Sequence, residues 1–430
     1  MRLNRRVVGF ALFALVCWAP KTAIATDSEF SLAKPYGECR LGFWNSNRNL
    51  DDTKNVAQTQ CLLNWKPRIS PSLQANFNLR AAAVHGEPSP LAQAPSAAIK
   101  TSALARFREA YVQADMGDVS VRAGRQIIAW GRADRVSPTD VLSPRDFTML
   151  TAEDDEQRKG IDAVSGKYQI NSEISATAIV NRFEAHTLPL GQLPASLVTN
   201  PSPQDTEWSL RLDRTGTGWD AALSYFDGRD RSPRYWANVS GSGISFARTY
   251  ERHRLLGADF ATSLGRWTLR AEAALIKASP DCAACPLKSR DIKRWVLGTD
   301  RDFGDASNIN VQLFGVSRDG YAQPSTGNPP ATLIAINQGL DRLNSEYGSH
   351  EWGVTVRWSS RFMNDRLRTE IAAIKEFKNG SSVLRPRLSY AINDSVTMRM
   401  GVDHFSGKAQ SYFGSRSKNN IAYAEIAIQF

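Results

Sequence analysis

The last twelve residues of the chain, NNIAYAEIAIQF, alternate between two kinds of side chain. Phe430, Ile428 and Ile426 occupy one set of alternate positions, whereas Glu425 and Tyr423 occupy the other. A repeat of two residues is the side-chain period of a β-strand, whose successive side chains point to opposite faces. The end of the chain therefore predicts a strand with one apolar face and an aromatic last residue.

The same alternation recurs along the whole chain. Within 266–277, Trp267, Leu269 and Leu275 share one face, and Arg270 and Glu272 lie on the other. A soluble β-sandwich could contain such strands, so the pattern alone leaves two architectures open. The predicted strands number 18 and cover residues 40–46, 57–67, 72–82, 103–115, 118–128, 160–169, 173–181, 206–214, 217–226, 254–263, 266–277, 292–302, 307–317, 350–358, 366–376, 382–391, 395–404 and 420–430.

The connections between these strands alternate in length, which distinguishes the two architectures. Long connections cover 47–56, 83–102, 129–159, 182–205, 227–253, 278–291, 318–349 and 405–419. Short ones cover 68–71, 116–117, 170–172, 215–216, 264–265, 303–306, 359–365 and 392–394, and 377–381 is a short link on the long side. Membrane barrels have short periplasmic turns and long extracellular loops. We predict an all-β fold, a transmembrane antiparallel up-and-down barrel of about 18 strands with both chain ends in the periplasm.

The chemistry of the two strand faces fits this barrel. In a membrane barrel the apolar face contacts lipid and the polar face lines the lumen. Tryptophans near the predicted strand ends fit the aromatic girdles of the membrane interfaces; they are Trp219, Trp267, Trp295, Trp352 and Trp358. The charged residues predicted to line the lumen are Arg211, Arg270, Arg357, Arg387, Arg399, Glu272, Glu351 and Glu370.

The C-terminal strand carries a further prediction. An alternating last strand that ends in an aromatic residue resembles the sequence that the barrel-assembly machinery recognises, and here it comprises Tyr423, Ile426, Ile428 and Phe430. The last strand must pair with the first, because an open sheet edge is not tolerated in lipid.

The N-terminus indicates export. Arg2, Arg5 and Arg6 precede an apolar run over 7–18, and Ala23 and Ala25 form a small-x-small cleavage site. We therefore predict a signal peptide at 1–25 and a barrel domain at 26–430. The formal charge is +10, and four of the positive charges lie in the signal peptide, which leaves +6. These basic residues are scattered, so no nucleic-acid partner is expected.

Four cysteines follow the signal peptide: Cys39, Cys61, Cys282 and Cys285. An even number of cysteines in an exported chain favours disulfides. The first two strands form a hairpin that brings Cys39 near Cys61, although their register is imperfect and would require a bulge. The Cys282–Cys285 pair could instead be a redox or zinc motif, but neither a second pair nor a nearby histidine supports zinc. We predict disulfides Cys39–Cys61 and Cys282–Cys285.

One segment carries a family resemblance. The stretch GRQIIAWGRADRVSPTDVLSPRDFTMLTAEDDEQRKGIDAV begins at Gly124 and combines GRQ, WGRAD, SPTD, PRD and EDD motifs. It resembles a segment of poorly characterised porin-like outer-membrane barrels of Gram-negative bacteria. Some of these are encoded beside exporters of the resistance-nodulation-division type, and the family is distantly similar to alginate-export barrels. The resemblance implies an outer-membrane location but specifies no substrate.

The function that fits these features is a pore or transport conduit for polar, anionic or other organic solutes. A barrel of this size leaves room for an aqueous channel. The alternatives are an outer-membrane partner of an exporter for hydrophobic molecules and a closed structural or adhesive barrel. The five histidines show no recognisable Ser/His/acid arrangement, so we expect neither an enzyme nor a cofactor. Outer-membrane lipid, the barrel-assembly machinery and an exporter or other periplasmic protein are the candidate partners; the oligomeric state is not predicted.

The loop at 129–159 is the candidate functional element. A long loop without a helix of its own is often functional, and we predict that it folds into the barrel and narrows it. Opposite charges across a lumen would orient polar solutes. The alternative is a solvated outer loop whose charges pair among themselves, and the acidic run at 153–156 lacks the spacing of a calcium loop. The predicted constriction residues are Arg132, Asp134, Arg135, Asp140, Arg145, Asp146, Glu153, Asp154 and Asp155.

Overall fold

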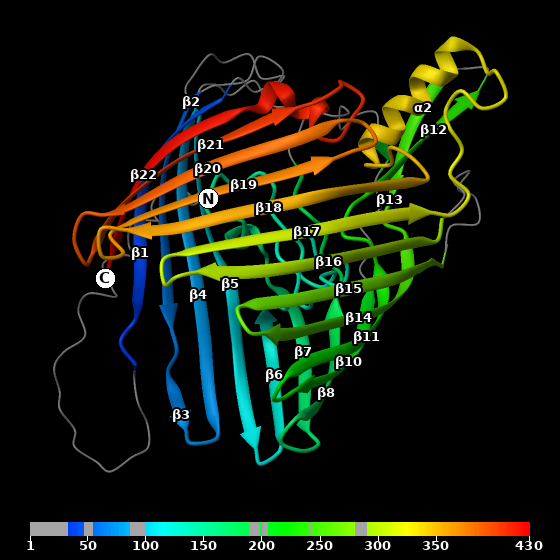
Figure 1. Cartoon of the computed structure of the whole chain (residues 1–430). Coiled ribbons are helices and arrows are strands. Elements are labelled where there is room, and N and C mark those ends of the chain that lie inside the picture. The colour runs from blue at the N-terminus through cyan, green and yellow to red at the C-terminus, as the bar shows by residue number, and fades with distance from the viewer. Residues whose placement is uncertain are drawn as a thin grey trace, which may run out of the picture.

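The long strands of the chain form one closed antiparallel barrel (Figure 1). The computed structural model describes residues 33–46, 55–86, 100–188, 198–199, 205–240, 243–279 and 290–430. Strand β1 (Tyr36–Ser46) pairs with the last strand, β22 (Ile421–Gln429), and closes the ring. Phe430 extends this pairing, because its backbone N–H donates to the Gly37 carbonyl at 3.0 Å and its carbonyl accepts from the Gly37 N–H at 2.9 Å. The predicted closure through the C-terminal strand is therefore confirmed.

All 18 predicted strands are present, with ends that differ by a few residues from those expected. Each strand pairs with its neighbours in the sequence, as expected of an up-and-down barrel. Between β1 and β22 lie β2 (Asn55–Trp65), β4 (Leu73–Gly86), β5 (Lys100–Met116), β6 (Val119–Gln126), β7 (Ile161–Gln169), β8 (Ile174–Arg182), β10 (Thr206–Thr215), β11 (Trp219–Arg229), β14 (Arg252–Leu264), β15 (Trp267–Ala278), β16 (Ile292–Phe303), β17 (Ser307–Arg318), β18 (His350–Phe362), β19 (Leu367–Glu376), β20 (Ser381–Ala391) and β21 (Val396–Ser406).

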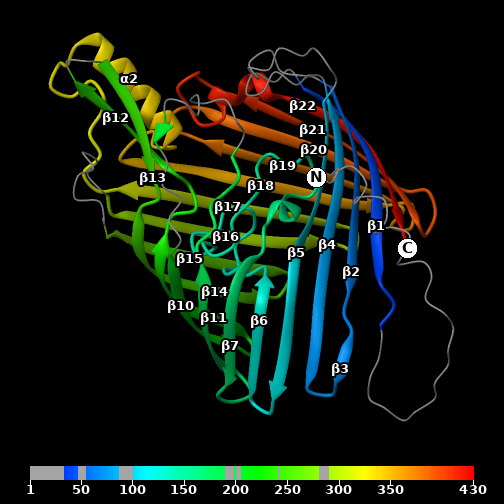
Figure 2. The same cartoon turned by 180° about the vertical axis from the view of Figure 1, so that it is seen from behind.

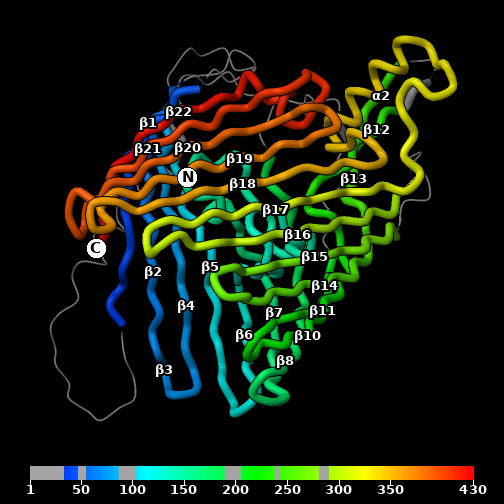
Figure 3. The backbone as a smooth tube through the Cα atoms, viewed as in Figure 1, coloured from blue at the N-terminus to red at the C-terminus, as the bar shows by residue number. Residues whose placement is uncertain are grey.

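The predicted rhythm of connections is also present (Figure 3). Tight turns join β5 to β6, β14 to β15 and β16 to β17 at one end of the barrel. The other end carries the long connections, including 127–160 between β6 and β7 and 319–349 between β17 and β18. The start of β1 and the end of β22 lie together at the end with the tight turns, because Gly37 pairs with Phe430.

Side chains alternate between the outer and the inner face of the wall. In β1, Leu41 is 62% exposed and Phe43 53%, whereas Arg40 is 8% and Trp44 4% exposed. The exposed set is apolar because it faces outward, where a membrane barrel contacts lipid, and the buried set faces the lumen. The same alternation repeats around the ring, for example in the burial pattern of β10.

Outward-facing aromatic residues mark both ends of the strands. Trp219 and Trp267 lie next to tight turns, and Trp295 and Trp352 lie near the long connections; all four are at least 39% exposed. Trp358, the fifth predicted girdle residue, is partly buried in β18. Aromatic rings at two levels are typical of the interfacial girdles of membrane barrels.

Several long connections contain strands or helices that the sequence analysis treated as loop. Strands β12 (Arg234–Ser240) and β13 (Gly243–Thr249) form a hairpin, and β9 (Val198–Thr199) pairs with β13. Helix α2 (Ala331–Leu343) lies in the connection before β18. The Asn344 side chain joins the two regions, because it accepts from the Tyr235 N–H at 2.7 Å and donates to the Tyr235 carbonyl at 2.9 Å. The remaining short elements are β3 (Arg68–Ser70), η1 (Asp154–Gln157) and η3 (Gly414–Asn419).

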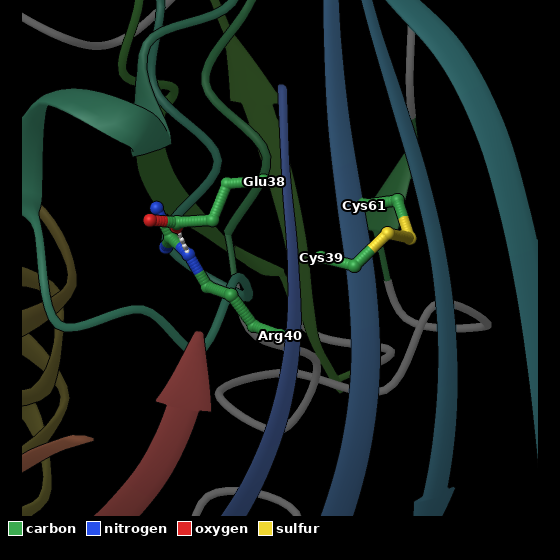
Figure 4. Close-up of a disulfide and its surroundings, with 4 residues drawn as sticks. All are labelled: Glu38, Cys39, Arg40 and Cys61. Atoms are coloured by element: carbon green, nitrogen blue, oxygen red, sulfur yellow. Dashed lines mark hydrogen bonds and ion pairs between the residues drawn. A yellow bond between two sulfur atoms is a disulfide. The ribbon is translucent and has the colours of Figure 1, made fainter. Parts of the chain in front are cut away.

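The first hairpin contains the disulfide Cys39–Cys61 (Figure 4). Cys39 and Cys61 are direct partners in the β1–β2 register, and the pairing continues without a shift from Tyr36 to Asn45. The bulge that we expected in this hairpin is therefore absent, and that detail of the prediction is wrong. Glu38 and Arg40 point to the opposite face of the strand from the sulfur atoms (Figure 4). Cys282 and Cys285 lie outside the described residues.

Candidate functional site

The connection between β6 and β7, residues 127–160, folds into the barrel, and we call it the lumen loop. Figures 1 and 2 show its chain, with the short turn η1, inside the ring of strands. Its side chains and backbone contact inward-facing residues on β1, β5, β14, β15, β18, β19 and β20. The loop therefore crosses the lumen and is fastened to walls on several sides of it.

The first half of the lumen loop is anchored by apolar packing. Leu142 is fully buried, in a cluster with Ile161, Phe226 and Leu255 from the wall. Trp130 and other partly buried apolar residues of the loop pack against this cluster. Burying a leucine side chain contributes about 1.5–3 kcal/mol. On the side of β7, β11 and β14 the barrel interior thus contains a small hydrophobic core.

Glu272 of β15 holds the turn that follows Trp130. Its carboxylate is 3% exposed and accepts hydrogen bonds from the backbone N–H groups of Arg132 and Ala133. The hydroxyl of Ser137 donates to it at 2.7 Å and that of Thr139 at 3.2 Å. Gly131 permits this turn, because its φ is +96° and an added Cβ would collide with Ser137 and Glu272. We expected Glu272 to be a charge that lines the path, but it is buried beneath the loop as an anchor.

The charged residues of the loop pair with the wall. Arg132 forms an ion pair with Asp259 of β14 and lies 3.9 Å from Asp213 of β10. The Asp134 carboxylate lies 2.8 Å from the Arg357 guanidinium on β18. The Arg135 guanidinium lies 2.6 Å from Glu370 on β19. These ion pairs connect the loop to the wall. A solvated outer loop would instead pair its charges among themselves.

The acidic run at 153–156 overlaps the turn η1 (Asp154–Gln157) and contacts several arginines. Arg385, Arg135 and Arg387 approach the Asp154 carboxylate at 2.7, 2.8 and 3.4 Å. Burial alone would raise the pKa of Asp154, but the positive charges of Arg385, Arg387 and Arg135 outweigh it and hold the pKa below its usual range. Ionised Asp154 is therefore the form that the structure stabilises.

The other three acidic residues of this run differ from one another. Glu156 accepts from Arg40 of β1 at 2.7 Å and from the Thr151 hydroxyl at 2.6 Å. Asp155 is 87% exposed and lies 3.3 Å from Arg158. Glu153 is exposed and forms no ion pair with any described residue. The run is thus an arginine-bound turn, with two of its four carboxylates directed at the barrel wall.

A segment after β8 clamps the middle of the lumen loop. The Arg145 N–H donates to Nδ1 of His186 at 2.8 Å, and its carbonyl accepts from the Thr187 N–H at 2.9 Å. Phe147 N–H donates to the Thr187 carbonyl at 2.9 Å. Asp146 lies 2.7 Å from Arg106 of β5. Burial lowers the pKa of His186, the negative charge of Asp230 opposes this, and the positive charges of Arg231, Arg145 and Lys159 add to it, so that the pKa is about 4. His186 is therefore a neutral acceptor, a role that sequence reasoning missed.

The remaining predicted lumen residues face inward and are paired. Arg211 lies 2.8 Å from Asp259, Arg399 lies 2.9 Å from Glu38, and Arg318 lies 2.5 Å from Glu351. Arg270 pairs with Asp300 of the neighbouring strand. Asp140, on the loop itself, pairs with Arg158 at 2.6 Å and lies 3.7 Å from Arg145. These predicted lumen residues are therefore members of ion pairs and are not free charges.

Three arginines of the β4–β5 wall were not predicted. Arg80 is 4% exposed, donates to Gln60 at 2.9 Å and has no carboxylate partner among the described residues. Arg106 lies opposite Arg80 in the β4–β5 register, and Arg108 donates to the Asp155 carbonyl at 3.2 Å. A register shift at Asn78 and Leu79 accompanies this arrangement, and bulges commonly redirect side chains in this way. The RFR triplet at 106–108 was the sequence signal that could have indicated it.

Arg385 of β20 was also not predicted as a site residue, and it links Asp154 to the barrel wall. Its Nε and Nη2 groups donate to the two carboxylate oxygens of Asp403 on β21, at 2.8 and 2.9 Å, and its Nη1 group donates to Asp154. Arg385 occupies the same strand face as Arg387, so the alternation could have identified it.

Within the part of the chain that the structure describes, no group of acidic, histidine and cysteine residues could hold a metal ion. No described helix is both long and apolar enough to cross a bilayer.

Comparisons with known proteins agree with this architecture. A sequence profile of the family described as "Protein of unknown function (DUF1302)" matches residues 71–283, a range that contains the whole lumen loop. No curated protein matches the chain in sequence. Among solved structures, OccAB1 of Acinetobacter baumannii has a TM-score of 0.58 at 9% identity, over 95% of this chain and 99% of its own.

Two porins from Pseudomonas are similar to the same extent. OpdK of Pseudomonas aeruginosa, solved with vanillate, has a TM-score of 0.56 at 12% identity, over 92% of this chain and 98% of its own. A BenF-like porin of Pseudomonas fluorescens Pf-5 has a TM-score of 0.54 at 10% identity, over 92% and 97% of the two chains. At such identities the likeness concerns the fold, which is the barrel of these porins.

Proposed function

We propose that this chain is an outer-membrane pore that passes small organic solutes, with a preference for anions, through a lumen narrowed by the lumen loop. The observation that carries the proposal is the position of that loop, which crosses the lumen and is fastened to opposite walls. A closed structural barrel has no need of such a loop, whereas a selective channel needs a constriction. The likeness to porin barrels, one of them solved with vanillate, supports the same function.

The anion preference rests on the balance of charges near the path. Arg80 and Arg108 have no carboxylate partner among the described residues. Arg294 lies on the inward face of β16 and forms no ion pair with any described carboxylate. Most acidic side chains in the lumen are already bound to arginine. Unpaired guanidinium groups attract carboxylates, for which their planar donor fork is suited. An outer-membrane location and the absence of catalysis follow from this role as expectations, and pairing with an exporter stays an alternative.

Conductance in a planar bilayer tests the proposal. We expect discrete conductance steps and a reversal potential that favours anions. Deleting 135–155 should raise the conductance several-fold, because this segment fills the lumen. Replacing Arg132 by alanine leaves Asp259 and Asp213 with one arginine fewer, so it should shift selectivity towards cations, and Arg145→Ala should do the same. A correctly assembled deletion variant with unchanged conductance and selectivity would contradict the constriction.

A further inference from the structure

Three guanidinium groups converge on one carboxylate of the lumen loop. Arg135, Arg385 and Arg387 all reach Asp154, at distances between 2.7 and 3.4 Å. The same arginines also contact Glu370 and Asp403, which belong to the barrel wall. These three positive charges are matched by three negative ones, of which the loop contributes Asp154. Arg357, which also lies 4.0 Å from Glu370, is matched by Asp134. Without Asp154 the cluster would carry one unmatched positive charge.

The turn that contains Asp154 is held differently from the first half of the loop. The first half of the lumen loop is anchored by the apolar cluster around Leu142 and by the buried Glu272. In contrast, η1 (Asp154–Gln157) is a single turn with no buried residue. Its contacts with the barrel wall are the ion pairs of Asp154 and Glu156 with arginines of β20 and β1, and the hydrogen bond from Arg108 of β5 to the Asp155 carbonyl. Such contacts can be replaced by a competing anion, whereas apolar packing cannot.

We propose that the guanidinium groups of Arg135, Arg385 and Arg387 form a binding site for the carboxylate of a permeating organic acid, and that Asp154 occupies this site in the present structure. The inference rests on the proposed pore function and adds a substrate class and a mode of opening. The Asp154 side chain is 30% exposed, so the cluster is accessible from the lumen. A solute carboxylate that displaces Asp154 releases the η1 turn and widens the path, because binding favours the state in which the arginines are free for it.

The charge balance also specifies the ligand. Glu370 and Asp403 stay bound to Arg135 and Arg385, so displacement of Asp154 leaves room for one negative group. The site therefore suits a monocarboxylate with an uncharged body. A cation is repelled, and an uncharged amide of the same shape cannot replace the charge of Asp154. This contrast between acid and amide provides the experimental probe.

Benzoate and benzamide test the site, since they share a ring and differ in charge. At constant ionic strength, benzoate should raise the mean conductance of the wild-type pore several-fold above that in chloride alone, and benzamide should have no effect. In Asp154→Asn the turn lacks its charge, so the conductance should be high from the start and the benzoate response lost. Asp155→Asn is the matched control, because it makes the same change one residue away, where the side chain is 87% exposed and contacts only Arg158. It should respond as the wild type does.

Hydrogen–deuterium exchange provides a second readout that does not depend on conduction. Benzoate should accelerate exchange in 153–158 of the wild type and leave 131–142 unchanged, and heat-modifiable electrophoretic mobility confirms that each variant is assembled. The inference is overturned if benzoate affects Asp154→Asn and Asp155→Asn alike, or if it only blocks the wild-type current. If no variant conducts yet benzoate still accelerates exchange in the turn, the pore proposal falls and the binding site stands.

Discussion

Glu272→Gln should detach the first half of the lumen loop without unfolding the barrel. The carboxylate is 3% exposed and accepts four hydrogen bonds, from two backbone N–H groups and from the hydroxyls of Ser137 and Thr139. An amide keeps one acceptor oxygen and places an N–H₂ group where the other oxygen was. It therefore cannot accept from all four donors.

The magnitude follows from the lost charge. Hydrogen bonds to a charged acceptor contribute about 1.5–3 kcal/mol each and those between neutral groups about 0.5–1.5 kcal/mol, so making all four bonds neutral costs about 3 kcal/mol. That free energy corresponds to a factor of about 100 in the population of the detached loop. The strand itself keeps its ladder of backbone bonds to β14 and β16, so the barrel should assemble as before.

Hydrogen–deuterium exchange of the 131–133 amides measures this change. We expect exchange about 100-fold faster in Glu272→Gln than in the wild type. Glu351→Gln is the control, because Glu351 is also a mostly buried carboxylate but pairs with Arg318 near the loop before β18, away from the lumen loop. Unchanged protection of the amides of Arg132 and Ala133 in Glu272→Gln would refute the view that Glu272 anchors the loop.

Four further predictions concern other parts of the chain. As the pH falls from 6.5 to 4, the contacts of His186 with the lumen loop should weaken, because the neutral imidazole stabilises the loop fully only above its ordinary pKa and this stabilisation is lost towards its lowered pKa of about 4. The noise of the open-state current should therefore rise in acid, and His186→Asn should remove this pH dependence. Burial raises the pKa of Asp341 to about 6, so the loop that contains α2 should resist proteolysis better at pH 5 than at pH 8, and Asp341→Asn should be equally resistant at both. Peptide mass spectrometry without reduction should recover the disulfides Cys39–Cys61 and Cys282–Cys285, and free thiols at these positions would contradict the pairing. A tag at Lys288 should be labelled on intact cells, and labelling only after permeabilisation would contradict the predicted topology.

The sequence by itself determined the strands and their order around the barrel. The two-residue period is a property of each segment, because a strand in a membrane barrel must present one face to lipid wherever its neighbours lie. The alternation of long and short connections is equally local, and so the closed barrel could be inferred without any knowledge of contacts. The hairpin of β1 and β2, with its disulfide, is predictable for the same reason, since its partners are near in sequence.

Only the tertiary structure decided which charges meet. Arg135 and Glu370 are separated by 235 residues, and Arg132 and Asp259 by 127, so no local pattern links them. Their pairing depends on which strands face the loop after the ring has closed. The same closure buried Glu272 beneath a turn and placed Arg80 opposite Arg106, because a side chain's environment in the lumen is set by strands that are distant in the sequence.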